Sequence, residues 1–343
     1  MRVSRRNLLC TAAIGTLVQL ATLFPLDAAA QSVEQFYKGK TVTLGIGSGV
    51  GGSHDVNGRL AARHLGKHIP GNPTVVPQNV PGAASLPLAN HIAEGAPRDG
   101  TYIAIFNRAG IFDKLYDANS NATFDPSKFN WLGSPDKIWS VAYAWHTAKA
   151  KKAEDLRANE LIVGASGGTT ESIPTLLNQF AGFKFKIVRG YKSGGDVDLA
   201  TERGEVEGRA STTWAELKKR PWLREKTANV LFWNGLEKHR DLPDAPLGLD
   251  FIKGADDRKL MELFFAADEI GYPFAAPPGV PEDRVTALRK AFSDMLADPA
   301  YVAEANKLEF DVNPVTWQRM SKIVADAYAT PAAAQKRLQD AMK

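Results

Sequence analysis

The fold of this 343-residue chain is decided by residues 40–69, which read KTVTLGIGSGVGGSHDVNGRLAARHLGKHI. The run 40–46 is apolar and rich in β-branched residues, which is typical of a buried strand, and it passes into the glycine-dense turn 45–52. Apolar residues then recur at helical spacing, at Val56, Leu60, Leu65 and Ile69. A strand that enters a helix through a glycine turn predicts one unit of an α/β fold.

The same unit recurs along the chain. Further strands are expected at 74–77, 101–106, 141–145, 161–163, 184–189 and 271–276, and further glycine-containing turns at 79–85, 164–168 and 190–195. We therefore predict an α/β protein with two lobes, each a mainly parallel sheet flanked by helices, joined by crossing hinge strands. Lobe 1 comprises 31–138 and 272–343, and lobe 2 comprises 139–271.

The first thirty residues have the pattern of a signal peptide. Arg2, Arg5 and Arg6 precede an apolar stretch, 11–24, and the small residues 28–30 suit a signal peptidase. The run 4–9 also matches the twin-arginine export pattern. The apolar stretch is shorter than the ~20 residues that span a bilayer. We expect export to the periplasm with cleavage near Ala30.

Composition excludes several functions. The single cysteine, Cys10, lies inside the leader, so the remainder has no disulfide and no thiolate metal site. The chain carries 42 lysine and arginine residues against 38 acidic ones, and the leader accounts for three of the former and one of the latter. The near-neutral remainder gives no electrostatic footprint for nucleic acid.

The three glycine turns 45–52, 164–168 and 190–195 suit an anion. Turns of this kind gather at the carboxyl ends of parallel strands, where a helix N-terminus offers unpaired N–H groups and a partial positive charge. Glycines allow close approach of the backbone, and hydroxyl donors stand nearby at Ser48, Ser53, Ser85, Ser166, Thr169, Thr170 and Ser193. The alternative is that each turn merely caps its helix.

Other chemistries have weaker signals. The glycines at 45–51 lack the Lys-Ser/Thr pair of a phosphate-binding loop. Residues 164–168 fit the Gly-x-Ser-x-Gly pattern of a hydrolase with Ser166 as nucleophile. However, His239 is the only histidine downstream of Ser166, it stands in a charged stretch interpreted as an exposed loop, and Pro174 is expected to interrupt the following helix. A catalytic residue is therefore not expected.

Histidines could indicate a metal, but none is expected here. His64 and His68 share a helix face, yet they alternate with Arg63 and Lys67 on what we interpret as the solvated side, and no acid stands between them. His54 is different because it lies in the first turn of its helix. It could donate to an anion or cap the helix, and both interpretations stay open.

Six motifs in this order resemble the periplasmic substrate-binding receptors of tripartite tricarboxylate transporters, the Bug-type receptors. The resemblance runs from about Tyr37 to Tyr328. Its motifs are Gly51-Gly52 with Asp55 and Arg59, Asn79-x-Pro81-Gly82-Ala83, Ala96-Pro97-x-Asp99-Gly100, Gly190-Tyr191 with Gly194, Arg203-Gly204-Glu205-Val206-x-Gly208, and Ala276-Pro277-Pro278-Gly279-Val280-Pro281.

The resemblance implies a periplasmic-binding-protein-like fold that closes on a small carboxylate, with no cofactor. It implies that one carboxylate is held by the loops at 51–55 and 81–85, and that lobe 2 contributes through 166–170 and Ser211. Ala84 stands where relatives have a glycine, and Ser211 where many have an aspartate. The expected ligand-binding residues are Ser48, Gly49, Gly51, Gly52, Ser53, His54, Asp55, Gly82, Ala83, Ala84, Ser85, Ser166, Thr169, Thr170 and Ser211.

We therefore expect a monomeric receptor that captures a small organic acid for the membrane permease subunits of a tripartite tricarboxylate-type transporter. Two alternatives remain: a ligand sensor that docks on a sensor kinase, and a serine hydrolase that uses Ser166.

Overall fold

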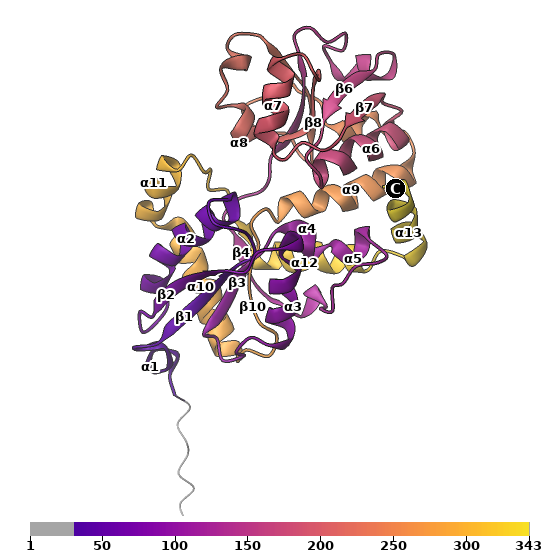
Figure 1. The fold of residues 1–343 in the computed structure, drawn as a ribbon. Coiled ribbons are helices and arrows are strands. Elements are labelled where there is room, and N and C mark those ends of the chain that lie inside the picture. Colours follow the sequence, from indigo (N-terminus) through magenta and orange to yellow (C-terminus); the bar gives the residue numbers. More distant parts are fainter. Residues whose placement is uncertain (1–30, 343) are drawn as a thin grey trace, which may run out of the picture. The chain divides into compact units, whose positions relative to one another are not determined.

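The computed structural model describes residues 31–342, which form two sheets covered by helices (Figure 1). The predicted signal peptide, its twin-arginine motif and the cleavage site near Ala30 lie outside the described residues. Within 31–342, none of the helices combines the length and apolar character needed to span a bilayer.

The first sheet, sheet A, has six strands in the order β11-β4-β10-β3-β1-β2. Its strands are β1 (Thr41–Ile46), β2 (Thr74–Asn79), β3 (Tyr102–Ile105), β4 (Asn130–Ser134), β10 (Phe274–Ala276) and β11 (Val315–Thr316). Strand β1 pairs in parallel with β2 and β3, whereas β10 pairs antiparallel with β3 and β4, and β11 pairs antiparallel with β4. Strands β1 to β4 therefore all run in one direction.

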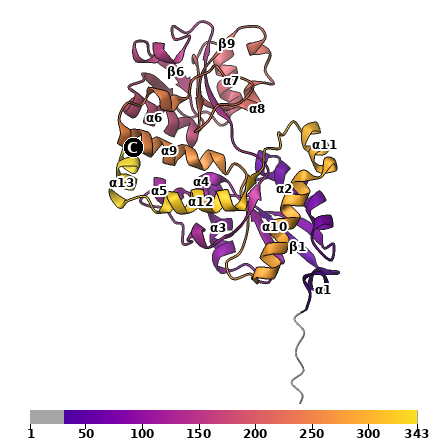
Figure 2. The same ribbon diagram turned by 180° about the vertical axis from the view of Figure 1, so that it is seen from behind.

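Helices cover both faces of sheet A. One face packs on α1 (Val33–Tyr37), α2 (Ser53–Leu65), α10 (Glu282–Ala297) and α11 (Pro299–Lys307). The other packs on α3 (Leu86–Glu94), α4 (Arg108–Ile111), α5 (Asp113–Tyr116) and α12 (Trp317–Tyr328). Figure 2 shows α10 and α12 from behind. In β1 the side chains of Val42, Leu44 and Ile46 point to the first face, as the period-two alternation of a strand requires.

The second sheet, sheet B, has five strands in the order β7-β6-β8-β5-β9. Its strands are β5 (Ser140–Trp145), β6 (Leu161–Gly164), β7 (Phe185–Val188), β8 (Gly208–Thr213) and β9 (Ala228–Asn234). Strand β6 is parallel to β7 and β8, while β5 is antiparallel to β8 and β9. Four strands thus share one direction and β5 opposes them.

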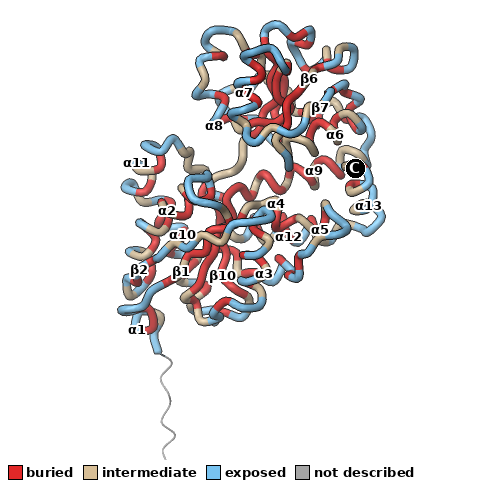
Figure 3. The backbone as a smooth tube through the Cα atoms, viewed as in Figure 1, coloured by how far each residue is buried: buried red, intermediate tan, exposed pale blue. Residues whose placement is uncertain are grey.

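The faces of sheet B differ in character. One face packs on α6 (Thr169–Ala181), α9 (Ala255–Glu269) and α13 (Ala332–Ala341). The other carries α7 (Gly194–Glu202), α8 (Trp214–Leu217) and a cluster of aromatic residues. Alternation along β5 sends Ala142 and Ala144 to the first face and Tyr143 and Trp145 to the aromatic one. Buried residues follow the strands of both sheets in Figure 3.

Helix α9 contributes to the cores of both sheets. Leu260 and Phe265 belong to the core of sheet B, whereas Ala267 and the following Ile270 belong to the core beside sheet A. The helix therefore belongs to both cores. The predicted lobe boundaries at 138/139 and 271/272 stay a prediction.

The predicted fold class is confirmed: two α/β lobes, each a sheet flanked by helices. The sheets are mixed rather than mainly parallel, because β5, β10 and β11 run against their neighbours. The crossing segments 135–139 and 271–273 are not strands. The segment 135–139 leads from β4 of sheet A directly into β5, the strand that opposes the others of sheet B.

Candidate functional site

Three loops meet at the carboxyl edge of the parallel strands of sheet A. Strands β1, β2 and β3 end at Ile46, Asn79 and Ile105, and their register places these ends side by side. Open α/β sheets bind ligands at such an edge. The loops that follow are 47–52, 80–85 and 106–107.

The first loop ends at an uncapped helix. Gly52 is the N-cap of the 13-residue helix α2 and has no side chain, so the first-turn N–H groups of α2 receive no side-chain cap. Gly51 has φ 86°, a left-handed conformation that favours glycine, and Gly49 and Gly51 are exposed. The loop therefore presents backbone donors to an anion.

A charged network holds this loop in place. The Asp55 carboxylate accepts hydrogen bonds from the Gly51 N–H at 2.9 Å, from Arg59 Nε at 2.9 Å and from Asn79 Nδ2 at 2.8 Å. Asn79 Nδ2 also donates to the Ser48 carbonyl at 2.9 Å, and Arg59 Nη2 donates to Asn79 Oδ1 at 2.7 Å. Asp55 is only 2% exposed.

The network decides the role of Asp55. Burial raises the pKa of the Asp55 carboxyl, but the hydrogen bonds from Arg59, Gly51 and Asn79 outweigh it, so the net pKa lies below its usual range. Because its oxygens are engaged by the protein, Asp55 acts as a brace of the loop. The sequence motifs containing Asp55, Arg59 and Asn79 thus meet in one network.

The second loop has an unusual backbone. Gly82 has φ 126°, and three residues without glycine's freedom follow in the left-handed region, Ala83 at 38°, Ala84 at 50° and Ser85 at 76°. Such strain persists only where surrounding contacts fix it. Gly82, Ala83 and Ala84 are exposed at the loop surface. The Ala84 carbonyl lies against Gly110, where a Cβ would come within 2.0 Å of its oxygen.

Ser85 joins the three loops. Its hydroxyl donates to the Gly47 carbonyl at 2.7 Å and accepts from the Asn107 N–H at 2.7 Å. A Cβ at Gly47 would lie 2.1 Å from the Ser85 Oγ, so this contact requires glycine. Ser85 is 1% exposed, and its hydroxyl holds the loops together.

The third loop contains residues that sequence reasoning missed. Asn107 caps the short helix α4 by accepting from the Ala109 N–H at 2.9 Å. Arg108 Nε donates to Asp268 Oδ1 on α9 at 2.5 Å, and both side chains are largely buried. The available signal was polar residues placed directly after the predicted strand 101–106.

His54 is a neutral, buried residue. Burial, followed by the charge of Arg108, lowers its pKa to about 3, so the imidazole carries no charge at neutral pH. Its ring lies edge-on to Tyr272 with centroids 5.0 Å apart. The His54 Nε2 atom is buried without a partner in the described structure. His54 therefore offers a neutral donor or acceptor rather than a cation.

The corresponding edge of sheet B carries neutral side chains. Strands β8 and β9 end where β5 begins, so Ser140 lies between Thr213 and Asn234 in the register. The hydroxyls of Ser140 and Ser211 are 3.1 Å apart, and Asn234 Nδ2 donates to the Ala210 carbonyl at 2.8 Å. Ser211 was expected here from sequence, whereas Ser140 and Asn234 were missed because no local motif marks them.

The turn before α6 provides a second uncapped helix N-terminus. Gly168 is the N-cap of this 13-residue helix and makes no side-chain cap, and Gly167 has φ 93°. The Thr170 hydroxyl is engaged, since it accepts from the Ser166 N–H at 3.0 Å and donates to the Gly167 carbonyl at 2.7 Å. Thr169 is partly exposed in the first turn.

The third predicted turn is closed by its own residues. The Ser193 hydroxyl accepts from the Asp196 N–H at 3.2 Å and so caps α7. The capping alternative therefore describes this turn, whereas the turns at 47–52 and 166–168 lack such a cap.

Two expectations used against a hydrolase were wrong in detail. His239 is 5% exposed rather than in an exposed loop, because its ring packs on Trp139 and Trp233 at 4.8 and 5.7 Å. Helix α6 continues through Pro174, since the burial of its apolar face compensates for the lost hydrogen bond. Among the described residues, no hydrogen bond joins Ser166 to His239.

His64 and His68 were also placed wrongly. His64 in α2 is buried rather than solvated, and its Nε2 lies 2.6 Å from Glu304 Oε2 on α11. His68 lies in the 3-10 turn that follows α2, and its Nε2 lies 3.1 Å from Oδ2 of Asp298, the N-cap of α11. These pairs attach α2 and the turn after it to the region of α11. Within residues 31–342, no cluster of three histidine, cysteine or acidic side chains is arranged to hold a metal.

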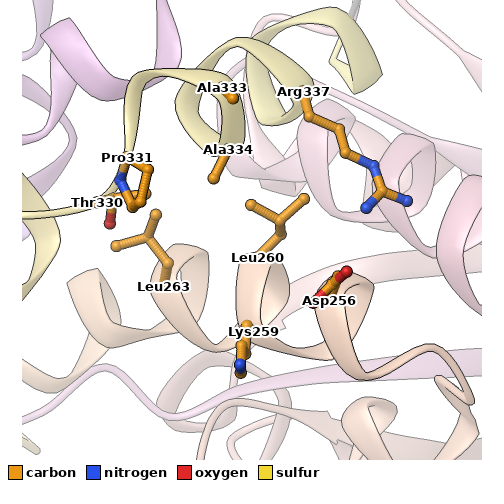
Figure 4. Close-up of a pocket in the computed structure, with 9 residues that line it drawn as sticks. All are labelled: Asp256, Lys259, Leu260, Leu263, Thr330, Pro331, Ala333, Ala334 and Arg337. Atoms are coloured by element: carbon orange, nitrogen blue, oxygen red, sulfur yellow. The ribbon is translucent and has the colours of Figure 1, made fainter.

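Three hollows of about 500 Å³ within residues 31–342 lie away from the predicted residues. One separates α9 from α13, where Leu260, Leu263 and Ala334 face each other and Arg337 stands at the rim (Figure 4). Another lies between α10 and the start of α12. The lining of the first is mainly apolar and lacks converging donors, so size alone does not make it the anion site.

Solved structures with the same fold are solute-binding proteins. A TctC solute-binding protein from Polaromonas aligns with a TM-score of 0.68 and 16% identity, over 89% of this chain and 99% of its own. MatC from Rhodopseudomonas palustris, solved with malate, aligns with a TM-score of 0.58 and 17% identity, over 89% of this chain and 99% of its own. The periplasmic binding protein BugD aligns with a TM-score of 0.59 and 18% identity, over 89% of this chain and 98% of its own.

No protein-family model matches the chain, and neither does any curated protein sequence. The structural neighbours are nevertheless of the class that the six sequence motifs resemble, and their full-length alignment confirms the fold that this resemblance implies.

Proposed function

We propose that this protein is a periplasmic receptor of the tripartite tricarboxylate transporter class, which captures a small organic carboxylate and delivers it to the permease subunits. The observation that carries the proposal is the pair of uncapped 13-residue helices, α2 and α6, whose N-termini follow glycine loops at the carboxyl edges of the two sheets. Such termini hold an anion with backbone N–H groups. The neighbour MatC was solved with malate, which supports a carboxylate.

In this proposal the carboxylate contacts the backbone of 49–54 and 82–84, while Asp55 and Ser85 fix these loops. The second lobe closes on the ligand with the turn at 166–170 and with Ser211. Ligand binding stabilises the closed arrangement, and no bond is made or broken. The protein acts as an exported monomer after cleavage near Ala30, and it needs no cofactor.

The test is a thermal-shift and calorimetric screen of mono-, di- and tricarboxylates, together with mass spectrometry of any ligand that co-purifies with the native protein. We expect at least one carboxylate to bind with 1:1 stoichiometry and to raise the melting temperature. A screen with no binder would overturn the proposal. Loss of carboxylate uptake in cells without the receptor separates transport from sensing.

A further inference from the structure

The amide of Asn234 has a defined orientation at the edge of sheet B. Its Nδ2 donates to the Ala210 carbonyl at 2.8 Å and lies 3.3 Å from the Ser140 hydroxyl. A backbone carbonyl only accepts, so the atom facing Ala210 is the nitrogen. The remaining atom, Asn234 Oδ1, is buried and has no partner in the described structure, and the residue is 2% exposed. This oxygen requires a hydrogen-bond donor.

A second unpartnered atom belongs to another residue that lines a hollow together with Asn234. Trp139 and Asn234 both line a hollow of about 20 Å³, and Trp139 Nε1 is buried with no acceptor in the described structure. A hollow of this size holds about one water-sized group. A hydroxyl or an amide nitrogen fits this volume, and the unpartnered atoms supply one acceptor and one donor.

The charges around this hollow disfavour a carboxylate. Its charged residues are Lys137, Glu237, Asp268 and Glu269. Lys137 is paired with Glu237, and the other two carboxylates are paired with Arg108 and Arg319. Acids outnumber bases in the lining, and its one lysine is already engaged. A second carboxylate would place acceptor oxygens against Asn234 Oδ1 without a free cation.

A chain of residue contacts runs from this hollow toward the first turn of α2. Trp139 also lines a neighbouring hollow of about 50 Å³ together with Tyr272. Tyr272 in turn contacts His54 in the first turn of α2. The segment from Ser134 to Ser140 spans at most ~20 Å when extended, so the end of β4 in sheet A and the start of β5 in sheet B lie no farther apart than this.

We infer that the second polar group of the ligand is uncharged and donates a hydrogen bond to Asn234 Oδ1, so that the preferred ligand is a monocarboxylate ending in an amide or a hydroxyl rather than a dicarboxylate. This inference rests on the proposed function, in which the carboxylate occupies the glycine loops. It differs from the dicarboxylate that MatC holds.

The test uses four-carbon carboxylates that share one end and differ at the other: succinamate, 4-hydroxybutanoate, succinate, 4-aminobutanoate and butanoate. Calorimetry on the unmodified protein should show succinamate or 4-hydroxybutanoate binding at least tenfold more tightly than the other three. The same series at six carbons covers a longer ligand. Equal or tighter binding of a dicarboxylate or of an amino acid would overturn the inference while leaving the proposed function intact. Absence of binding by every carboxylate would overturn both.

Asn234→Leu tests the role of the amide directly. We expect the variant to bind succinamate and succinate with affinities within twofold of each other, while binding of carboxylates persists. Asn229→Leu makes the same change at the opposite end of β9 and should keep the tenfold preference. A preference that survives in Asn234→Leu would contradict the assignment, and the ligand series decides the question if that variant does not fold.

Discussion

The two sheet edges hold polar groups by different means. At sheet A, the charged side chains of Asp55 and Arg59 brace the glycine loop 47–52, and the N-terminus of α2 has no side-chain cap. At sheet B, the buried side chains of Ser140, Ser211 and Asn234 form a neutral hydrogen-bonded group. Lys137, the lysine that lines the hollow beside Asn234, is paired with Glu237. Under our proposals, the backbone at the edge of sheet A binds the carboxylate, and Asn234 at the edge of sheet B selects an uncharged group at the other end of the ligand.

The largest effect should come from blocking the backbone donors of sheet A. Gly52 has φ −74°, and a Cβ there meets only ordinary contacts, the nearest at 3.7 Å, so Gly52→Val leaves the fold intact but covers the N-terminus of α2. We expect roughly a hundredfold loss of carboxylate affinity, about 2.7 kcal/mol, by calorimetry.

The matched control for that change is Gly195→Val in the capped turn of sheet B. Its Cβ would also meet its nearest neighbour at 3.7 Å. We expect its affinity to stay within twofold of the natural protein. Equal losses in the two variants would erase the distinction between the edges. Gly82→Val is a poorer probe, because φ 126° at Gly82 strains any side chain.

Removing the brace should have the next largest effect. Asp55→Ala leaves Arg59 and the Gly51 N–H without their acceptor, and we expect unfolding to become easier by about 2 kcal/mol in urea titrations, with roughly a tenfold loss of carboxylate affinity. Asp196→Ala in the turn of sheet B is the control and should affect neither quantity strongly. An Asp55→Ala protein of full affinity would show that the loop needs no brace.

The pH dependence of stability should test whether His54 is neutral in the folded protein. The unfolded chain takes up a proton near pH 6.5 and the folded chain only near pH 3, so His54 lowers stability as the pH falls below 6.5. Between pH 7.5 and 5.5 this amounts to about 1.4 kcal/mol. His54→Gln should lose that part of the slope in denaturant titrations, whereas His91→Gln, at an exposed histidine, should not.

The slope of the unfolding free energy against pH must be compared between variants, because Asp136 changes this free energy with pH in the direction opposite to His54. Burial, opposed by hydrogen bonds from Asn313 and the Lys137 N–H, raises the Asp136 pKa to about 7. The protonated Asp136 therefore stabilises the folded state below pH 4, and this stabilisation is lost as the pH rises toward 7. If the unfolding free energy of the natural protein and that of His54→Gln changed equally with pH, His54 would not be neutral in the folded protein.

The smallest effect is expected at the capped turn. Ser193→Ala removes the cap of α7 and should lower stability by about 1 kcal/mol, with ligand affinity unchanged. A change in affinity would mean that this turn also meets the ligand, and sheet B would then resemble sheet A more closely than its geometry indicates.

Local sequence was enough for most strands, the glycine turns and the fold class, because strand alternation and helical spacing are local properties. Strands β4, β9 and β11 were not predicted. The brace was not predictable in this way, since Asp55 and Asn79 come together only through the pairing of β1 with β2. Asn234 and Arg108 lie in no motif, and their roles depend on distant partners. His239 was misplaced because Trp139, far away in sequence, covers it.

The uncapped N-terminus of α2 has a consequence for the history of the chain. Every amino acid except proline supplies the same main-chain N–H, so a site built from these groups survives the exchange of nearly all surrounding side chains. Substitutions can accumulate until sequence comparison finds no relative, while the loop path and the anion-binding chemistry persist. New ligand preferences can then arise through changes at the other edge alone, without rebuilding the part that holds the charge.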